Sequence, residues 1–467
     1  MKLIRNPRHR PRQVIKEIGS AAQKVIHHTP PALEIIIGLF TLIAVGTALL
    51  SIPGASTQSL TFLQALFTSA SASTVTGLVL FSPATALTFW GQIIILILAQ
   101  IGGVSLIVTV SLVSYLLGRQ TTLSRRLTVA SSLGLDTPRE IMRVMARAMM
   151  LMFIIEAVGA VLLYIHWRFS GIVPADQVFF YSIFHAVMAF CNAGFDLFSG
   201  LPQYNGIPSD PISLVIMGIL IFLGGLGIPV YMNLIFGRKR HRLTLHTKVT
   251  LFIAAILILT GWIGLSLSEY WQSGVLSGMP PIQRITVTLF QSVSSRSAGF
   301  TSLPGFNDIN APSALLLITL MMIGAAPASS GGGITTGTFA VLLFAVISYA
   351  RGYEHIRIRK RSLPDKLIQR AMVILMLCIS MVIAGTWLLL FTNPFPLTET
   401  LFEVVSAFST TGLSMGITAG LNHIGQWILI IMMFCGRFGA ITIMVALLGS
   451  EPRKRLVDFP EESILIG

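Results

Sequence analysis

Four short segments with the same pattern decide the fold, and in each a small residue is followed by glycine and a large apolar residue. They are Thr74-Val75-Thr76-Gly77-Leu78, Cys191-Asn192-Ala193-Gly194-Phe195, Arg296-Ser297-Ala298-Gly299-Phe300 and Ser409-Thr410-Thr411-Gly412-Leu413. Their glycines lie 117, 105 and 113 residues apart. A spacing this long and this regular predicts one structural unit that occurs four times along the chain.

The composition indicates an integral membrane protein. Hydrophobic residues make up 54% of the 467 residues and charged residues only 11%, which is too little charge for the surface of a soluble protein of this size. The basic segment 12–28 has apolar residues at helical spacing, which predicts an amphipathic helix on the inner membrane surface; a disordered basic tail is the alternative. The three cysteines have no metal-ligand spacing, and we find no catalytic motif, so we do not expect an enzyme or a covalent cofactor.

Apolar segments of two lengths alternate between these glycines. Roughly 20 residues are needed to cross a bilayer as a helix. The long segments are 33–52, 91–117, 146–164, 212–236, 248–267, 314–348, 371–391 and 426–448. The short amphipathic segments, which reach only partway across, are 60–73, 177–190, 282–295 and 398–408. We therefore predict that each unit consists of an outer helix, a half-helix, a glycine loop and an inner helix.

We accordingly predict an all-α membrane protein with four tandem helix–pore-loop–helix repeats around one pseudo-fourfold pore. The predicted parts are a basic amphipathic segment at 1–32, pore repeats at 33–118, 119–237, 238–350 and 351–450, and a cytoplasmic tail at 451–467. The second repeat includes a preceding cytoplasmic connector. The third includes an intramembrane gating loop at 324–338.

The basic residues give the predicted orientation. Of the 32 Lys and Arg, 28 lie in segments that fall on one side if the chain crosses the membrane eight times. These segments are 1–29, 118–147, 237–248, 351–370 and 452–467. The positive-inside rule makes that side cytoplasmic, with both termini. Topology and membrane lipids thus account for the net charge of +14 without a nucleic-acid partner.

The repeated unit suits cation conduction. Non-helical backbone at membrane depth is tolerated only where it is buried in protein or lines a water-filled path. Four loops around one axis can present rings of carbonyl oxygens that replace the hydration shell of a monovalent cation. The half-helices add the partial negative charge of their C-terminal ends. This arrangement needs no catalytic side chain.

The four glycine segments resemble the filter sequences of the Trk/Ktr/HKT superfamily of potassium transporters. Asn192 and Arg296 also stand where that family usually has Asn and Arg. The resemblance runs from about Pro31 to the closing residues 460–467 and is greatest to the membrane subunit of bacterial Ktr systems. In this family glycine in the first loop accompanies potassium preference, and serine there accompanies sodium transport. Gly77 therefore implies potassium.

The resemblance also implies which residues bind the ion, mainly through backbone oxygens. The predicted filter residues are Thr74, Val75, Thr76, Gly77, Asn192, Ala193, Gly194, Ser297, Ala298, Gly299, Thr410, Thr411 and Gly412. No other metal site is expected.

A gate is predicted in the third inner helix, where the sequence Ala326-Pro327-Ala328-Ser329-Ser330-Gly331-Gly332-Gly333 occurs. Proline costs about 3 kcal/mol and each glycine about 1 kcal/mol in a helix interior, so this segment predicts a loop. Arg437 lies within a span, where a charge must face a cavity or a partner. The resemblance implies that the loop is a gate and that this arginine helps to close it; an ion pair with Glu156 is the alternative. The predicted gating residues are Gly324, Pro327, Gly331, Gly332, Gly333 and Arg437.

Further expectations follow from the resemblance. It implies potassium uptake in the bacterial cytoplasmic membrane by a homodimer docked on a cytoplasmic ring of nucleotide-binding regulatory subunits. The alternative function is a sodium- or proton-coupled secondary transporter, in which a buried ionisable group carries the coupling. Glu156 is the clear candidate for that group.

Overall fold

The computed structural model describes residues 31–103, 141–236 except 203 and 205, 243–353 except 272–274 and 277, and 355–438 except 359 and 360. The regular secondary structure of these residues is mostly helical, which confirms the predicted helical fold class. One antiparallel pair of two-residue strands, β1 (Arg357–Ile358) and β2 (Arg361–Ser362), occurs between helices. Most of the predicted segment 1–32, residues 119–140 of the predicted repeat 119–237, and all of the predicted tail 451–467 lie outside the described residues.

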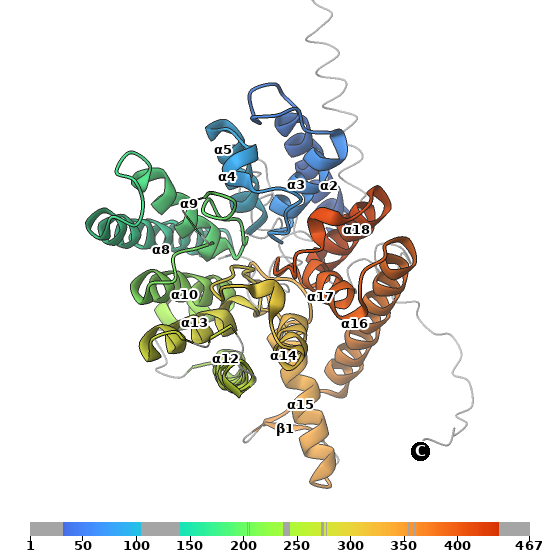
Figure 1. Ribbon diagram of the computed structural model, residues 1–467. Coiled ribbons are helices and arrows are strands. Elements are labelled where there is room, and N and C mark those ends of the chain that lie inside the picture. The colour runs from blue at the N-terminus through green and yellow to red at the C-terminus, as the bar shows by residue number, and fades with distance from the viewer. Residues whose placement is uncertain are drawn as a thin grey trace, which may run out of the picture.

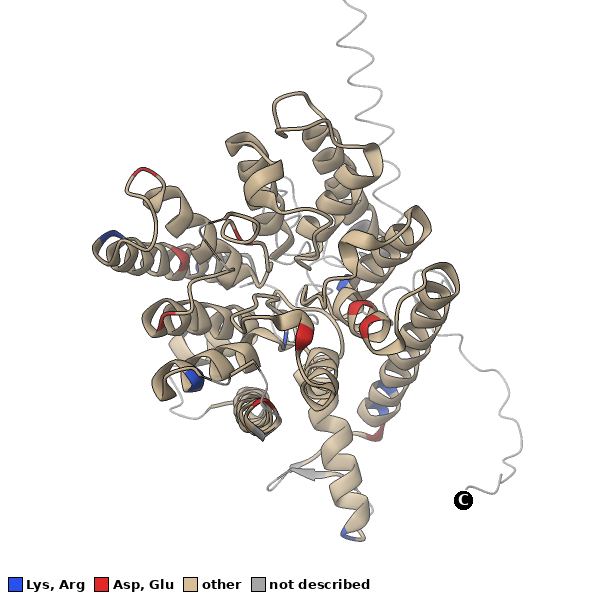
Figure 2. Ribbon diagram, in the orientation of Figure 1, with Lys and Arg blue, Asp and Glu red and all other residues tan. Residues whose placement is uncertain are grey.

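Figure 1 shows four groups of helices that follow one another in chain order around a common centre. Each group has an outer, a short and an inner helix. They are α2 (Pro31–Leu50), α3 (Phe62–Ser73) and α5 (Phe89–Gly103); α8 (Ile141–Ser170), α9 (Val178–Cys191) and α10 (Pro211–Gly225); α12 (Leu245–Trp271), α13 (Pro281–Ser294) and α14 (Ala311–Met322); and α16 (Asp365–Thr392), α17 (Leu397–Phe408) and α18 (His423–Phe438). The remaining elements are α4 (Pro83–Ala86), α11 (Ile228–Phe236), α15 (Thr336–Ala350), η2 (Phe306–Asp308) and η3 (Thr418–Gly420). Figure 2 shows that few charged residues interrupt these helices.

The groups pack in a closed cycle. Within each group the outer helix contacts both the short and the inner helix. Between groups, α5 contacts α9, α10 contacts α13, α14 contacts α17, and α18 contacts α3. The inner helix of every group thus supports the short helix of the next. This cycle places the C-terminal ends of the four short helices around one centre, while the predicted repeat boundaries themselves stay a prediction.

The ends of the outer and inner helices are tied together at the same place in every group. The contacts are Thr88 N to Ala55 O (3.1 Å), His166 Nε2 to Asp210 Oδ2 (2.7 Å), Asn310 N to Glu269 Oε1 (3.1 Å) and Asn422 N to Asn393 Oδ1 (2.9 Å). The interacting groups differ among the four contacts, but each contact joins the end of an outer helix to the start of its inner helix. Each group therefore forms a similar helical hairpin with the short helix held inside it.

Two predicted spans differ from the structure. The segment 212–236 is not one helix, because α10 and α11 are bent by 99° at a break after Gly225. Gly227 there has a φ of +79°, and Pro229 lacks the N–H that a continuous helix needs. The segment 314–348 is divided, as predicted, but the loop occupies residues 323–335, since Thr336 already begins α15.

The lengths of the described helices give fewer complete spans than the eight predicted. Three helices are long and apolar enough to cross a membrane, at Ala146–Ser170, Leu245–Tyr270 and Asp365–Thr392, and the bent pair α10 and α11 makes up to a fourth. The predicted spans 91–117 and 426–448 continue beyond the described residues. The described short helices begin and end within two residues of their predicted bounds.

Candidate functional site

The glycines of the four repeated segments meet at the centre of the helix groups. We call residues 74–77, 192–194, 297–299 and 410–412 glycine loops one to four. A β-carbon built on Gly77 would lie 2.4 Å from the carbonyl oxygen of Ala193, on Gly194 2.9 Å from that of Ala298, on Gly299 2.1 Å from that of Thr411, and on Gly412 2.0 Å from that of Thr76. Each loop thus contacts the next and the fourth contacts the first, so their backbones form a closed ring.

Three of the loops leave their short helices in the same way. Val75, Asn192 and Thr410, each two residues before the glycine, have φ values of +59°, +57° and +49°. A left-handed conformation costs a residue with a β-carbon about 1–2 kcal/mol. Such strain persists only where the surrounding structure enforces it, and it is common at functional sites.

Glycine loop three is different. In the other loops the residue before the glycine donates its N–H five residues back, as in the 2.9 Å bond from Thr411 N to Ser406 O. In loop three Ala298 N donates four residues back, to Ser294 O (2.8 Å). Ser297 also lacks the positive φ of Val75, Asn192 and Thr410, its counterparts in the other loops. The ring therefore has three similar loops and one that continues its helix more closely.

Side chains of the short helices fix loops one and four. The amide of Gly77 donates to Ser71 Oγ (3.1 Å), and the amide of Gly412 donates to Ser406 Oγ (3.0 Å). These hydroxyls satisfy the two glycine amides and tie each loop to its own short helix.

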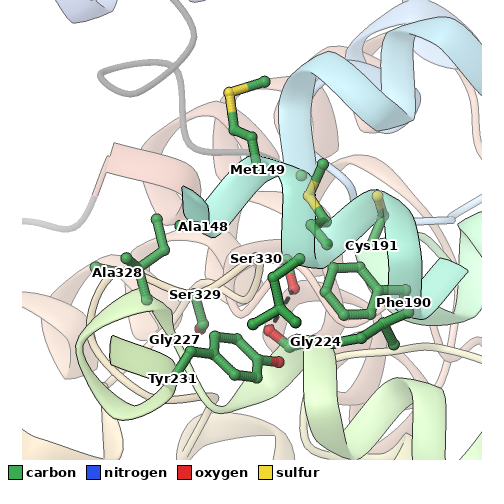
Figure 3. A pocket seen from close by; sticks show the side chains of 15 residues that line it. Ala148, Met149, Phe190, Cys191, Gly224, Gly227, Tyr231, Ala328, Ser329 and Ser330 are labelled. Atoms are coloured by element: carbon green, nitrogen blue, oxygen red, sulfur yellow. Dashed lines mark hydrogen bonds between the residues drawn. The ribbon is translucent and has the colours of Figure 1, made fainter. Parts of the chain in front are cut away.

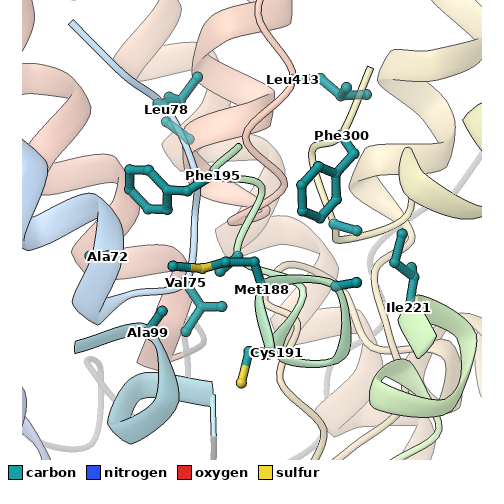
Figure 4. Packing of buried hydrophobic residues seen from close by; sticks show 14 of the residues in the cluster. Ala72, Val75, Leu78, Ala99, Met188, Cys191, Phe195, Ile221, Phe300 and Leu413 are labelled. Atoms are coloured by element: carbon teal, nitrogen blue, oxygen red, sulfur yellow. The ribbon is translucent and has the colours of Figure 1, made fainter. Parts of the chain in front are cut away.

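A large, buried apolar residue follows each glycine of the ring. Leu78, Phe195, Phe300 and Leu413 directly follow the four glycines and are at most 1% exposed. Figure 4 shows them in the upper half of the view, with Val75 and Met188 below. The structure thus brings all the predicted filter residues together, and the side chains among them are at most 3% exposed.

The predicted gating residues lie in and beside the loop between α14 and α15, which we call the intramembrane loop (residues 323–335). Its ends are joined, because Gly324 N donates to Ile334 O (2.9 Å). Its middle pairs with the break between α10 and α11: Ala326 N donates to Gly225 O (3.0 Å), and Ile228 N donates to Ala328 O (3.3 Å). The break that the sequence did not predict therefore supplies backbone partners for this loop.

The intramembrane loop lies directly against three glycine loops. Ser330 Oγ is 2.8 Å from the side-chain amide of Asn192 in loop two. A β-carbon on Gly331 would lie 2.8 Å from Ser297 Cβ in loop three, and one on Gly332 would lie 2.6 Å from Thr410 Oγ1 in loop four. The loop therefore sits against the ring rather than to one side of it.

Arg437 connects this loop to the first group. Its guanidinium donates to the carbonyl oxygens of Ser330 and Gly102. Glu156 has other partners, since it accepts from both Gln100 Nε2 (3.1 Å) and Cys191 Sγ (3.8 Å). In the described part of the chain no ion pair joins Arg437 to Glu156, so this part does not support the alternative of a structural pair.

A mainly apolar cavity of about 50 Å³ borders the intramembrane loop at residues 328–330. Figure 3 shows that α8 lines it with Ala148 and Met149, and that Cys191 and Tyr231 lie at its other walls. Sequence reasoning singled out neither Ser330 nor Tyr231, because an ordinary serine or tyrosine carries no signal of its position.

Comparisons with known proteins identify the family. Residues 28–458 match the family model TrkH, described as a cation transport protein. The chain is similar to Ktr system potassium uptake protein B of Bacillus subtilis (strain 168), at 33% identity over 95% of this chain and 98% of the relative. It is also 30% identical to the potassium/sodium uptake protein NtpJ of Enterococcus hirae, over 95% and 99% of the two chains.

The fold is similar to that of a solved structure. The crystal structure of the potassium transporter TrkH from Vibrio parahaemolyticus matches with a TM-score of 0.70 at 18% identity, covering 89% of this chain and 84% of that one. At this identity the match concerns the fold alone. It agrees with the helical architecture described above.

Proposed function

The chain belongs to the TrkH family of cation transport proteins, and we propose that it takes up potassium across the bacterial cytoplasmic membrane through a filter formed by the four glycine loops. The observation that carries this proposal is the closed ring of four backbones. Similarity to a potassium uptake protein over nearly the whole chain supports potassium as the cargo. Both termini would lie on the cytoplasmic side.

The ring suits a dehydrated monovalent cation. The carbonyl oxygen of the residue before each glycine lies next to the neighbouring loop, so oxygens from four loops surround one axis and can replace water around an ion. The C-terminal ends of α3, α9, α13 and α17 add partial negative charge at the same place. Potassium is the substrate here and needs no charged ligand.

The intramembrane loop would act as the gate. It contacts loops two, three and four, and Arg437 holds it to the first inner helix. A guanidinium at this position also repels a cation that has passed the ring. The similarity to a protein named as part of a Ktr system supports a further, regulatory subunit. For this assembly we propose a homodimer on a cytoplasmic ring of nucleotide-binding regulatory subunits, as the sequence resemblance implies.

A sodium-dependent mechanism is the second candidate, because one similar protein is named a potassium/sodium uptake protein. Glu156 would then be the coupling group. Its carboxylate is 4% exposed and accepts from Gln100 and Cys191 behind loop two. Glu156→Gln should abolish a sodium requirement if this carboxylate carries the coupling, and should leave it unchanged otherwise.

Flux into liposomes that contain the purified protein tests the filter. We would compare potassium with sodium entry for the wild type and Gly77→Ser. The added side chain meets the Ala193 backbone 2.4 Å away, so we expect loss of the preference for potassium. Gly54→Ser is the matched control, since Gly54 also has a positive φ, +103°, but nothing within 4 Å of its β-carbon position.

Two results would count against the filter. Unchanged selectivity in Gly77→Ser would remove glycine loop one from the ion path. Equal loss of selectivity in Gly54→Ser would attribute the effect to backbone strain rather than to the ring.

A further inference from the structure

Arg296 is a buried cation that the proposed function has not used. It directly follows Ser295, which caps the C-terminal end of α13, and is 8% exposed. Its Nη2 donates to the carbonyl oxygen of Gly324 (3.4 Å), at the start of the intramembrane loop. No carboxylate pairs with it in the described residues.

The charge of Arg296 is balanced by helix ends instead. The arginine follows α13, its acceptor Gly324 lies just beyond the end of α14, and Gly225 at the end of α10 lines the same small cavity. Each C-terminal end carries partial negative charge that stabilises a nearby cation. The guanidinium therefore lies where helices from the second and third groups end.

This cavity has a volume of about 20 Å³ and is lined by Arg296, Thr250 and residues 325–326 of the intramembrane loop. Arg296 Nε and Thr250 Oγ1 are both buried and have no hydrogen-bond partner among the described residues. The volume is sufficient for one water molecule, which needs such polar partners. The first end of the loop thus rests against a polar site organised by Arg296.

We propose that Arg296 is a positioning residue for the intramembrane loop, which fixes the loop's first end to glycine loop three. Arg437 holds Ser330, farther along the same loop, from the fourth group. Two guanidinium groups on different elements thus hold residues 324 and 330. This inference rests on the proposed function of the loop as a gate, because opening would have to release or move both contacts.

Basal potassium flux into liposomes tests the proposal. Losing one hydrogen bond from a charged group should raise the basal flux of Arg296→Gln by roughly tenfold. Arg296→Lys keeps the charge but not the planar donor set, so its flux should rise less, by about two- to threefold. Arg284→Gln is the matched control: Arg284 lies at the other end of α13 and contacts Met279 and Tyr270 instead.

A double variant tests whether the two arginines hold the same loop. If they do, Arg296→Gln combined with Arg437→Ala should raise flux by less than the product of the single effects, since a released loop cannot be released again. Potassium-over-sodium selectivity should stay as in the wild type, because the ring keeps its own backbone contacts.

The outcomes separate this inference from the proposed function. A leak is a basal potassium flux above that of the wild type. A leak in Arg437→Ala without a leak in Arg296→Gln would overturn the role of Arg296 but would leave the proposed gate in place. Absence of leak in both would overturn the gate itself. Lost selectivity without leak would assign Arg296 to the filter, against the proposal. Should Arg296→Gln fail to fold, wild-type flux in Arg296→Lys would overturn the proposal.

Discussion

The ring of glycine loops and the intramembrane loop are both glycine-rich, yet their glycines have different surroundings. A β-carbon on Gly299 or Gly412 would meet a backbone carbonyl of the next loop at 2.1 or 2.0 Å. On Gly331 or Gly332 the nearest atoms belong to side chains, Ala325 Cβ at 2.7 Å and Thr410 Oγ1 at 2.6 Å. The glycines of the ring are therefore packed backbone against backbone, whereas Gly331 and Gly332 of the intramembrane loop meet side chains first.

The hydrogen bonds follow the same division. The glycine loops are bound to their own short helices by backbone bonds, such as that from Thr411 to Ser406. Contacts from the intramembrane loop to the ring and to α18 pass through side chains, those of Ser330, Asn192 and Arg437. Side-chain contacts can be exchanged while the backbone of the ring stays in place. This difference suits a fixed filter and a movable gate.

The largest effect is expected from a side chain in the tightest part of the ring. In Gly412→Ala the β-carbon must displace the Thr76 carbonyl at a φ of +91°. Overpacking costs about 1–3 kcal/mol, and positive φ adds about 1–2 kcal/mol. We expect potassium flux in liposomes to fall by at least about thirtyfold.

Gly194→Ala provides the internal comparison for that variant. Its β-carbon would lie 2.9 Å from the Ala298 carbonyl, and its φ of +67° suits alanine better. It should retain more flux than Gly412→Ala. The reverse order would mean that the contacts between neighbouring loops do not set the tolerance of the ring.

The next largest effect is expected from Arg437→Ala. This change removes the donor to the carbonyl oxygens of both Ser330 and Gly102. Because hydrogen bonds from a charged group are worth about 1.5–3 kcal/mol each, basal potassium flux should rise at least about tenfold. Selectivity should not change. Arg168→Ala, at an exposed arginine near the end of α8, is the control and should behave as the wild type.

Parts of this comparison could be predicted from the sequence because they depend on local pattern. The glycine segments and the amphipathic segments before them located the short helices to within two residues. The run of Pro327 and three glycines located the intramembrane loop, since no helix continues through it. The four glycines could also be placed on one ring, because four copies of one unit predict a shared axis.

Other parts depend on contacts between distant residues and left no local signal. The backbone at the break after Gly225 is hydrogen-bonded to residues 326–328 of the intramembrane loop, which lie about a hundred positions away in the chain. Arg437 was weighed against Glu156 because charges are visible in a sequence. Its partners are carbonyl oxygens, which every residue has and no sequence pattern reveals.

A smaller effect should follow from Gly332→Ala, which sharpens the comparison from the side of the intramembrane loop. The added β-carbon meets the side chain of Thr410 at 2.6 Å, and that side chain can rotate. We expect the lower limit of the cost of overpacking, about 1 kcal/mol, and therefore a change in basal flux of only about fivefold. Thr410→Ser removes the methyl group at 3.0 Å, and the remaining hydroxyl can then rotate away more freely because serine is not β-branched. It should bring the flux of the double variant back toward the wild type. Loss of flux as severe as in Gly412→Ala would abolish the distinction between the two regions.

The smallest effect is expected from Ser330→Ala, which tests how independent the ring is of the intramembrane loop. The change removes the hydroxyl that contacts the Asn192 amide and the Gly224 carbonyl oxygen, but keeps the backbone carbonyl that accepts from Arg437. The contact to Gly224 is long (3.3 Å), so mainly one neutral hydrogen bond is lost. At the lower limit of about 0.5 kcal/mol for such a bond, basal flux should rise only about twofold. The potassium-to-sodium ratio decides the issue: an unchanged ratio supports a ring held by its own backbone, whereas a lower ratio would show that the intramembrane loop supports glycine loop two through Asn192.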